Sequence, residues 1–137
     1  MKSIMFFWTF AAVCVAAADC DILVSREGAC VEHWRAPEAG GVWQKVGVFL
    51  DGRKAGIHPT GITASADGLV YVGDGSEGGS VKVYGTDGAF RGVVATTGFR
   101  PDQLCISPDG KWLYVSTLEG EKRGVWRYAC ATGRGGQ

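Results

Sequence analysis

The stretch that decides the fold is residues 59–84, PTGITASADGLVYVGDGSEGGSVKVY. Two short apolar runs, 61–65 and 69–73, flank the dipeptide Asp67-Gly68, and a third run, 80–84, follows a loop of Gly, Ser and acidic residues. Alternating β-branched and aromatic residues, interrupted by Asp-Gly and Gly-Gly, are typical of antiparallel strands joined by tight turns. The stretch therefore predicts a β-meander.

A similar sequence pattern is repeated at residues 101–128, PDQLCISPDGKWLYVSTLEGEKRGVWRY. Pro59, Ile62 and Asp67-Gly68 correspond at a constant offset to Pro101, Leu104 and Asp109-Gly110, and after one inserted residue Tyr71-Val72 corresponds to Tyr114-Val115. A repeat of roughly forty residues is the length of four strands in one propeller blade. The predicted fold class is all-β, a partial β-propeller of antiparallel four-stranded blades that follows an N-terminal signal peptide.

The N-terminal residues 1–18 have the pattern of a secretory signal peptide. Lys2 provides a positive start, 4–15 is an uncharged apolar run, and 16–18 is Ala-Ala-Ala at the expected cleavage position. A membrane anchor is the competing interpretation, but the run is shorter than the roughly 20 residues that a spanning helix needs. We therefore predict a secreted, extracellular protein (periplasmic if the source is bacterial) with no membrane association after signal removal.

The charge and the cysteine content narrow the possible partners and binding sites of the protein further. The formal net charge is zero and no Lys/Arg cluster forms a basic face, so a nucleic-acid partner is not expected. Removal of the signal would leave Cys20, Cys30, Cys105 and Cys130. An even number in an exported chain favours disulfide bonds, in one of three pairings. A zinc site competes with this interpretation, but the chain has no C-x-x-C spacing.

The region 19–130 is expected to form the partial propeller, in blade-like units at about 20–57, 58–99 and 100–130, with a disordered tail at 131–137. The first unit is expected to lack its first strand, the second to be complete, and the third to end after three strands. No helix is expected after the signal. Ten strands are too few for a ring, since propellers close with about four to eight blades.

Three explanations of the incomplete ring remain. The chain is a fragment of a larger propeller, several copies assemble, or the sheets form an open arc. The fragment is favoured, because an open arc would expose apolar faces and strand edges to aggregation.

A meander places its loops at two ends, and this separates architectural from functional positions. The turns Asp67-Gly68, Asp87-Gly88 and Asp109-Gly110 share one end and serve only the fold. The loops at the opposite end are rich in charge, and binding residues on β scaffolds usually lie on such loops. The predicted ligand-binding face comprises His58, Asp74, Glu77, Arg100 and Glu119.

Asp74 is the best single candidate because it directly follows an apolar strand. Its carboxylate could bind a divalent cation or polarise water. The alternative is an Asx-turn that organises the loop 75–79. His58 is a weaker metal candidate, since the only other histidine, His33, lies in a predicted strand. The match of 73–78 to G-x-G-x-x-G is accidental, because a strand and not a helix follows it.

The run Tyr71-Val-Gly-Asp74, followed by Val81-Lys-Val-Tyr84, resembles the NHL repeat and its six-bladed relatives, and 106–115 is similar to repeats of the senescence-marker/gluconolactonase group. The resemblance covers nearly all of 20–130. In gluconolactonase-type relatives a divalent metal held by Glu, Asn and Asp activates water against a lactone, and the resemblance implies that Asp74 matches such an aspartate. This chain contains no Asn, and Thr117 stands where the third unit would repeat Asp74.

The functional prediction is a secreted NHL-type β-propeller repeat protein that acts as a binding or interaction module. Its partner would be a protein or small-molecule ligand on the loop face, with self-association as a way to complete a ring. The alternative is a metal-dependent hydrolase of the lactonase/gluconolactonase type, acting on a lactone or ester with Ca²⁺, Mg²⁺ or Zn²⁺. No catalytic residue is assigned.

Overall fold

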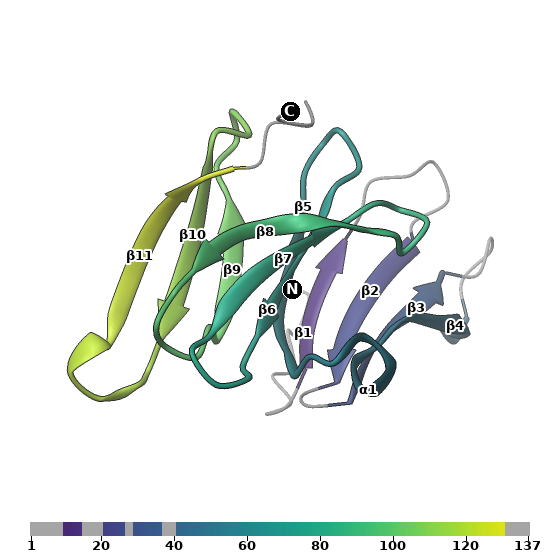
Figure 1. Cartoon of the computed structure of the whole chain (residues 1–137). Helices are drawn as coiled ribbons and strands as arrows, with labels where there is room; N and C mark the ends of the chain where they lie inside the picture. Colours follow the sequence, from purple (N-terminus) through teal and green to yellow (C-terminus); the bar gives the residue numbers. More distant parts are fainter. Residues whose placement is uncertain (1–9, 15–20, 27–28, 37–40, 131–137) are drawn as a thin grey trace.

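The computed structural model describes residues 10–14, 21–26, 29–36 and 41–130, with the backbone alone at 10–14 and 21. Three antiparallel sheets, each a simple meander, lie side by side like blades of an incomplete propeller (Figure 1). The first sheet contains β1 (Phe10–Cys14), β2 (Asp21–Arg26), β3 (Cys30–Arg35) and β4 (Gln44–Asp51). The second contains β5 (Pro59–Ala64), β6 (Val70–Asp74), β7 (Ser80–Tyr84) and β8 (Phe90–Thr96). The third contains β9 (Gln103–Ile106), β10 (Trp112–Thr117) and β11 (Gly124–Ala129).

The all-β prediction is confirmed, and the strand count of the first unit is corrected. Strand β1 pairs with β2 from Phe10↔Arg26 to Cys14↔Ile22 and occupies the position that was expected to be empty. It comes from the apolar run assigned to the signal peptide, because such a run suits a buried strand as well as a leader. The signal peptide itself stays a prediction, and the expected tail 131–137 lies outside the described residues. No helix among the described residues is long and apolar enough to cross a membrane.

The expectation of no helix after residue 18 is also wrong, although only at two short segments. Helix α1 (Gly52–Ala55) links the first sheet to the second, and a 3₁₀ turn, η1 (Gly120–Lys122), precedes β11. The Asp51 carboxylate caps α1 by accepting from the N–H groups of Arg53 and Lys54, at 3.0 and 3.2 Å. Gly56 ends the turn with a φ of 64°. The dipeptide Asp51-Gly52 has the composition of a simple turn, but an Asp in this position is also a favourable helix cap.

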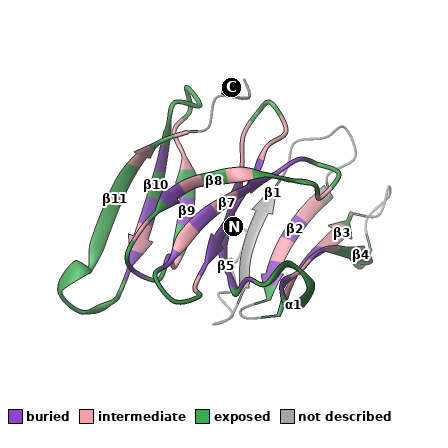
Figure 2. Ribbon diagram, viewed as in Figure 1, coloured by how far each residue is buried: buried purple, intermediate pink, exposed green. Residues whose placement is uncertain are grey.

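Strands β5, β6 and β7 of the second sheet are largely buried between the first and third sheets. On one face Val70, Val72 and Tyr84 pack against Leu23 and Val31 of the first sheet. On the other face Tyr71, Val81 and Val83 pack against Leu113 and Val115 of the third sheet. Alternate residues of one strand thus belong to two different cores, as the two-residue period of a strand requires. Figure 2 shows the resulting burial of β6 and β7.

The innermost strands β5 and β9 approach each other closely at Gly61. A Cβ atom added there would lie 2.6 Å from the carbonyl oxygen of Asp102 and 2.9 Å from Cα of Gln103. Only glycine allows the two backbones to lie this close. This contact fixes the position of the third sheet beside the second, and therefore the loops between them.

Cys30, Cys105 and Cys130 form no disulfide bond, which corrects the predicted disulfide pairing among them; Cys20 lies outside the described residues. Cys105 lies on β9 and Cys130 directly follows β11, with β10 between these strands. Two strand spacings separate such residues by roughly 9–10 Å, beyond the roughly 7 Å limit between bridged Cα atoms. Cys30 lies in the first sheet, on β3.

Candidate functional site

Three connections meet at the predicted loop end of the second and third sheets. They are the β6–β7 loop, the β8–β9 link and the β10–β11 loop. Together they line an open pocket of about 570 Å³, formed by residues 75–79, 98–100, 102 and 117–119. The opposite end carries the tight turns, in which Gly68, Gly88 and Gly110 each donate a backbone hydrogen bond to the residue three positions earlier.

Asp74 lies at the end of β6 and is only 4% exposed. Its Oδ1 accepts hydrogen bonds from the His58 backbone N–H at 2.9 Å, the Ser76 N–H at 3.0 Å and the Ser76 hydroxyl at 2.6 Å. Its Oδ2 accepts from Nζ of Lys82 at 2.6 Å. The bond to the N–H two residues ahead is an Asx-turn, so the alternative interpretation of Asp74 is confirmed.

The pKa of Asp74 reflects these contacts. Burial by itself raises the pKa, but hydrogen bonds from the His58 N–H, Lys82 and Ser76 outweigh it and lower the pKa to about 2. The carboxylate therefore stays ionised at neutral pH, and it is held by donors that already use both oxygens. It links the start of β5 to the end of β6 and supports the adjacent loop 75–79.

The donors around Asp74 do not fit a divalent cation. A cation there would face the ammonium group of Lys82, and Ca²⁺ needs six to eight oxygen ligands. Within the described part of the chain, no group of three or more His, Cys, Asp or Glu side chains could hold a metal. The metal assignment to Asp74 stays a prediction, and the geometry gives it no support.

The first sheet contains a similar ion pair with the charges reversed. Glu32 of β3 is buried and accepts from Lys45 Nζ at 2.6 Å, from Trp34 Nε1 at 3.1 Å and from Arg26 at 3.5 Å. Burial raises the pKa of Glu32, but the hydrogen bonds from Lys45 and Trp34 and the charges of Lys45 and Arg26 lower it overall. In the repeat, Arg26 and Glu32 correspond to Asp74 and Lys82. The same strand-end position therefore carries an ion pair of either polarity, with its carboxylate buried in both sheets, which indicates a structural role.

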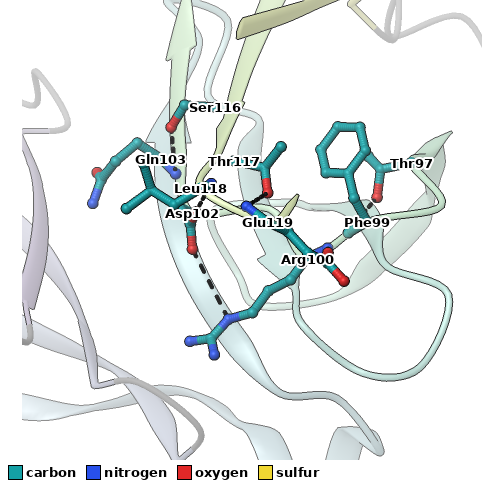
Figure 3. Close-up of polar contacts among 9 residues, drawn as sticks. All are labelled: Thr97, Phe99, Arg100, Asp102, Gln103, Ser116, Thr117, Leu118 and Glu119. Carbon is teal, nitrogen blue, oxygen red and sulfur yellow. Dashed lines mark hydrogen bonds and ion pairs between the residues drawn. The ribbon is translucent and has the colours of Figure 1, made fainter. Parts of the chain in front are cut away.

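The pocket itself is ordered by hydrogen bonds between the β8–β9 link and the β10–β11 loop (Figure 3). The Arg100 backbone N–H donates to Oε2 of Glu119 at 2.7 Å. The Leu118 N–H donates to Oδ2 of Asp102 at 2.7 Å, and Nε of Arg100 lies 4.0 Å from Oδ1 of the same carboxylate. The Thr117 hydroxyl accepts from the Glu119 N–H at 3.1 Å. The β8–β9 link and the β10–β11 loop thus form one wall of the pocket.

A close backbone approach shapes the other side of the pocket. Gly79 has a φ of 60°, and a Cβ atom added there would overlap the carbonyl oxygen of Phe99. Its N–H donates to the Ser76 carbonyl, and its own carbonyl accepts from the Thr97 N–H at 3.1 Å. The Phe99 ring packs on Trp126, with 5.5 Å between the ring centroids. The glycine-rich loop therefore serves the close contact of two backbones.

The predicted site residues fall into two groups. Glu77, Arg100 and Glu119 line the pocket together. Asp74 lies beside it and supports the loop, and His58 is exposed and contributes only its backbone to Asp74 in the contacts described. Sequence reasoning missed Leu118, which is 71% exposed, and the buried Phe99, because neither belongs to a periodic pattern. A large apolar residue between Thr117 and Glu119, just after a strand, was the available signal.

No family model and no curated protein matches this sequence. The fold is similar to the solved structure of a luciferin-regenerating enzyme, with a TM-score of 0.64 and 11% identity over 90% of this chain. The chain spans 45% of the length of that protein. At this identity the likeness concerns the fold alone and agrees with the propeller-like arrangement of the sheets.

Proposed function

We propose that this chain is a secreted β-propeller repeat module of the NHL type that binds a ligand in the pocket between its second and third sheets, without catalysis. The pocket carries this proposal, because it combines apolar and charged side chains on ordered loops. Small ligand sites are commonly concave, with few polar groups placed to orient the ligand. Here the exposed Leu118 lines the pocket together with Glu77, Arg100, Asp102 and Glu119.

The charges of the lining favour a ligand with a positive group. The lining contains three carboxylates, those of Glu77, Asp102 and Glu119, and one guanidinium, that of Arg100. Asp102 lies within ion-pair distance of Arg100, and one oxygen of Glu119 is used by a backbone N–H. Among the described contacts, Glu77 and the second oxygen of Glu119 accept no hydrogen bond, so we assign the ligand's positive group to them. A basic peptide side chain, with an apolar stem for Leu118, has the matching chemistry.

Ser76 argues for binding rather than for acyl transfer. Its hydroxyl donates to Asp74 at 2.6 Å, but a carboxylate with a pKa of about 2 is a poor general base at neutral pH. A serine nucleophile needs a base whose pKa lies near the working pH. The Ser76–Asp74 contact therefore orders the loop.

A lysine peptide tests the proposed ligand class. Titration of the ¹⁵N-labelled chain with the tripeptide Gly-Lys-Gly should shift the amide signals of 75–79 and 117–119, whereas Gly-Glu-Gly should not. The double substitution Glu77→Gln and Glu119→Gln should weaken binding by about tenfold, because each lost charge contributes roughly 1 kcal/mol or less at an exposed site.

Asp87→Asn is the matched control, since it removes a carboxylate at the opposite end and should leave the titration unchanged. Equal shifts with both tripeptides, or binding that survives loss of both glutamates, would contradict the proposal.

The metal-dependent lactonase or esterase remains the second candidate, since the neighbour in fold is named as an enzyme. A thermal melt with Ca²⁺, Mg²⁺ and Zn²⁺ distinguishes the hydrolase from the binding module. A ligand that binds the native state raises the melting temperature in a saturable way. The binding module is expected to show no such rise with these ions. A saturable rise with one ion that is lost in Asp74→Asn would favour the hydrolase.

A further inference from the structure

Among the described residues, the first and third sheets each present one face with no sheet packed against it. The open face of the third sheet consists of residues that share one side of β9, β10 and β11, namely Cys105, Trp112, Tyr114, Val125 and Arg127. Val125 is 70% exposed, and the guanidinium of Arg127 lies 4.3 Å from the centre of the Trp112 ring. Figure 2 shows β11 exposed along nearly its whole length.

The open face of the first sheet consists of Ile22, Val24, Glu32, Trp34 and Lys45, which share the side of β2, β3 and β4 that turns away from the second sheet. Ile22, Val24 and Trp34 are only half-buried. Strands β4 and β11 each form one edge of these two sheets. Exposed apolar side chains that share one face are typical of interaction surfaces.

The packing inside the molecule defines what fits each open face. The second sheet packs on the third through Tyr71 and Val81, and their equivalents in the repeat, Tyr114 and Val125, form the open face of the third sheet. The second sheet packs on the first through Val70, Val72 and Tyr84. Their equivalents Ile22, Val24 and Trp34 form the open face of the first sheet. The two open faces therefore repeat the two sides of a contact that the molecule already makes twice.

We propose that two copies of this chain pair head to tail, with the open face of the third sheet of each packed on the open face of the first sheet of the other. The two contacts are related by a two-fold axis and close a ring of six sheets. Six lies within the four to eight blades at which propellers close. The chain spans 45% of the luciferin-regenerating enzyme, so two copies approach the length of that single protein. The proposal rests on the sheet packing and is independent of the ligand proposed above.

Mass measurement in solution, by light scattering after size exclusion, tests the pairing in the full chain. The wild type should have twice the mass of one chain. Tyr114→Glu places a charge on the open face of the third sheet, and Ile22→Glu places one on the open face of the first sheet. Each variant should be monomeric. Val93→Glu, at a residue that is 53% exposed on β8 of the second sheet, should leave the dimer intact.

Mixing the two broken variants distinguishes head-to-tail pairing from other dimers. In the mixed dimer both substitutions fall in one contact and the other contact is intact, so the equal mixture should recover dimers that neither variant forms alone. A dimer made through β11 edges would be unaffected by Ile22→Glu and would not be recovered by mixing.

Circular dichroism checks that each variant is folded, and Val125→Glu replaces Tyr114→Glu if that variant is not. A monomeric wild type across the accessible concentrations would overturn the proposal and leave the missing sheets to a longer polypeptide. So would an Ile22→Glu variant that remains a dimer.

Discussion

Asp74→Ala should destabilise the chain by about 3–5 kcal/mol, the usual cost of removing one partner from a buried ion pair. The substitution leaves the Lys82 ammonium without its carboxylate and removes the acceptor for the His58 N–H and both Ser76 donors. Asp74 joins β5 to β6 and orders the loop 75–79. An alanine at this position has no side-chain acceptor for any of these hydrogen bonds. Urea unfolding, followed by circular dichroism, measures the free energy of unfolding.

The exposed pair Asp87–Arg91 provides the matched control. Its atoms are 3.4 Å apart and its side chains are 62% and 55% exposed. Asp87→Ala should therefore cost less than about 1 kcal/mol. The double variant Asp74→Leu, Lys82→Met should be more stable than Asp74→Ala, since it leaves no unpaired charge. A loss below about 1 kcal/mol for Asp74→Ala would show that the network is not the structural element inferred here.

The acid dependence of stability checks the same network independently. The pKa of Asp74 is lowered in the folded state from 3.8 to about 2. The resulting stabilisation, about 2 kcal/mol, is present above pH 4 and is lost as the pH falls from about 4 to about 2. The wild type should therefore lose stability in this window more steeply than Asp74→Ala. Parallel curves for the two proteins would contradict the assigned pKa.

The second large effect is expected from Gly61→Ala. The added Cβ would meet backbone atoms of Asp102 and Gln103 at 2.6 and 2.9 Å, and a backbone, unlike a flexible side chain, cannot rotate away. Overpacking of this kind costs about 1–3 kcal/mol and sometimes more. Because the contact joins β5 to β9, the third sheet should loosen first. Amide hydrogen exchange should then rise in β9 and β10 before it rises in β6 and β7.

Gly47→Ala on β4 is the control for this substitution, since a Cβ added there would have no atom within 4 Å. It should change the free energy of unfolding by less than about 0.5 kcal/mol. If Gly61→Ala were as stable as Gly47→Ala, the close approach of the two innermost strands would be wrong.

Much of the fold follows from local pattern. The alternation in 80–84 and 112–116 predicted β7 and β10 almost to the residue, because a two-residue period and the Asp-Gly turns are visible in a few neighbouring positions. Strand β1 was missed because an uncharged apolar run has no period that separates a leader from a buried strand. The disulfide prediction was wrong for another reason. An even number of cysteines does not show whether any two of them lie close enough to form a bond.

The candidate site was predictable only in part. The meander topology assigns the loops to two ends, and this brought Glu77, Arg100 and Glu119 to one face. What each side chain does there depends on contacts between distant loops. The Asx-turn at Asp74 is local and was foreseen as an alternative, but the bond to Lys82 crosses to the next strand. Leu118 and Phe99 line the pocket because of the way the third sheet packs. No sequence pattern predicts that packing.

Strand β1 has a consequence for processing of the polypeptide. Cleavage after Ala18, where a signal peptidase is predicted to act, would remove all of Phe10–Cys14. The processed chain would then expose the backbone N–H and C=O groups of β2 that β1 satisfies. Export with cleavage and a complete first sheet are therefore mutually exclusive for one molecule. Retained and processed forms would differ at the axis of the propeller, where the innermost strands meet.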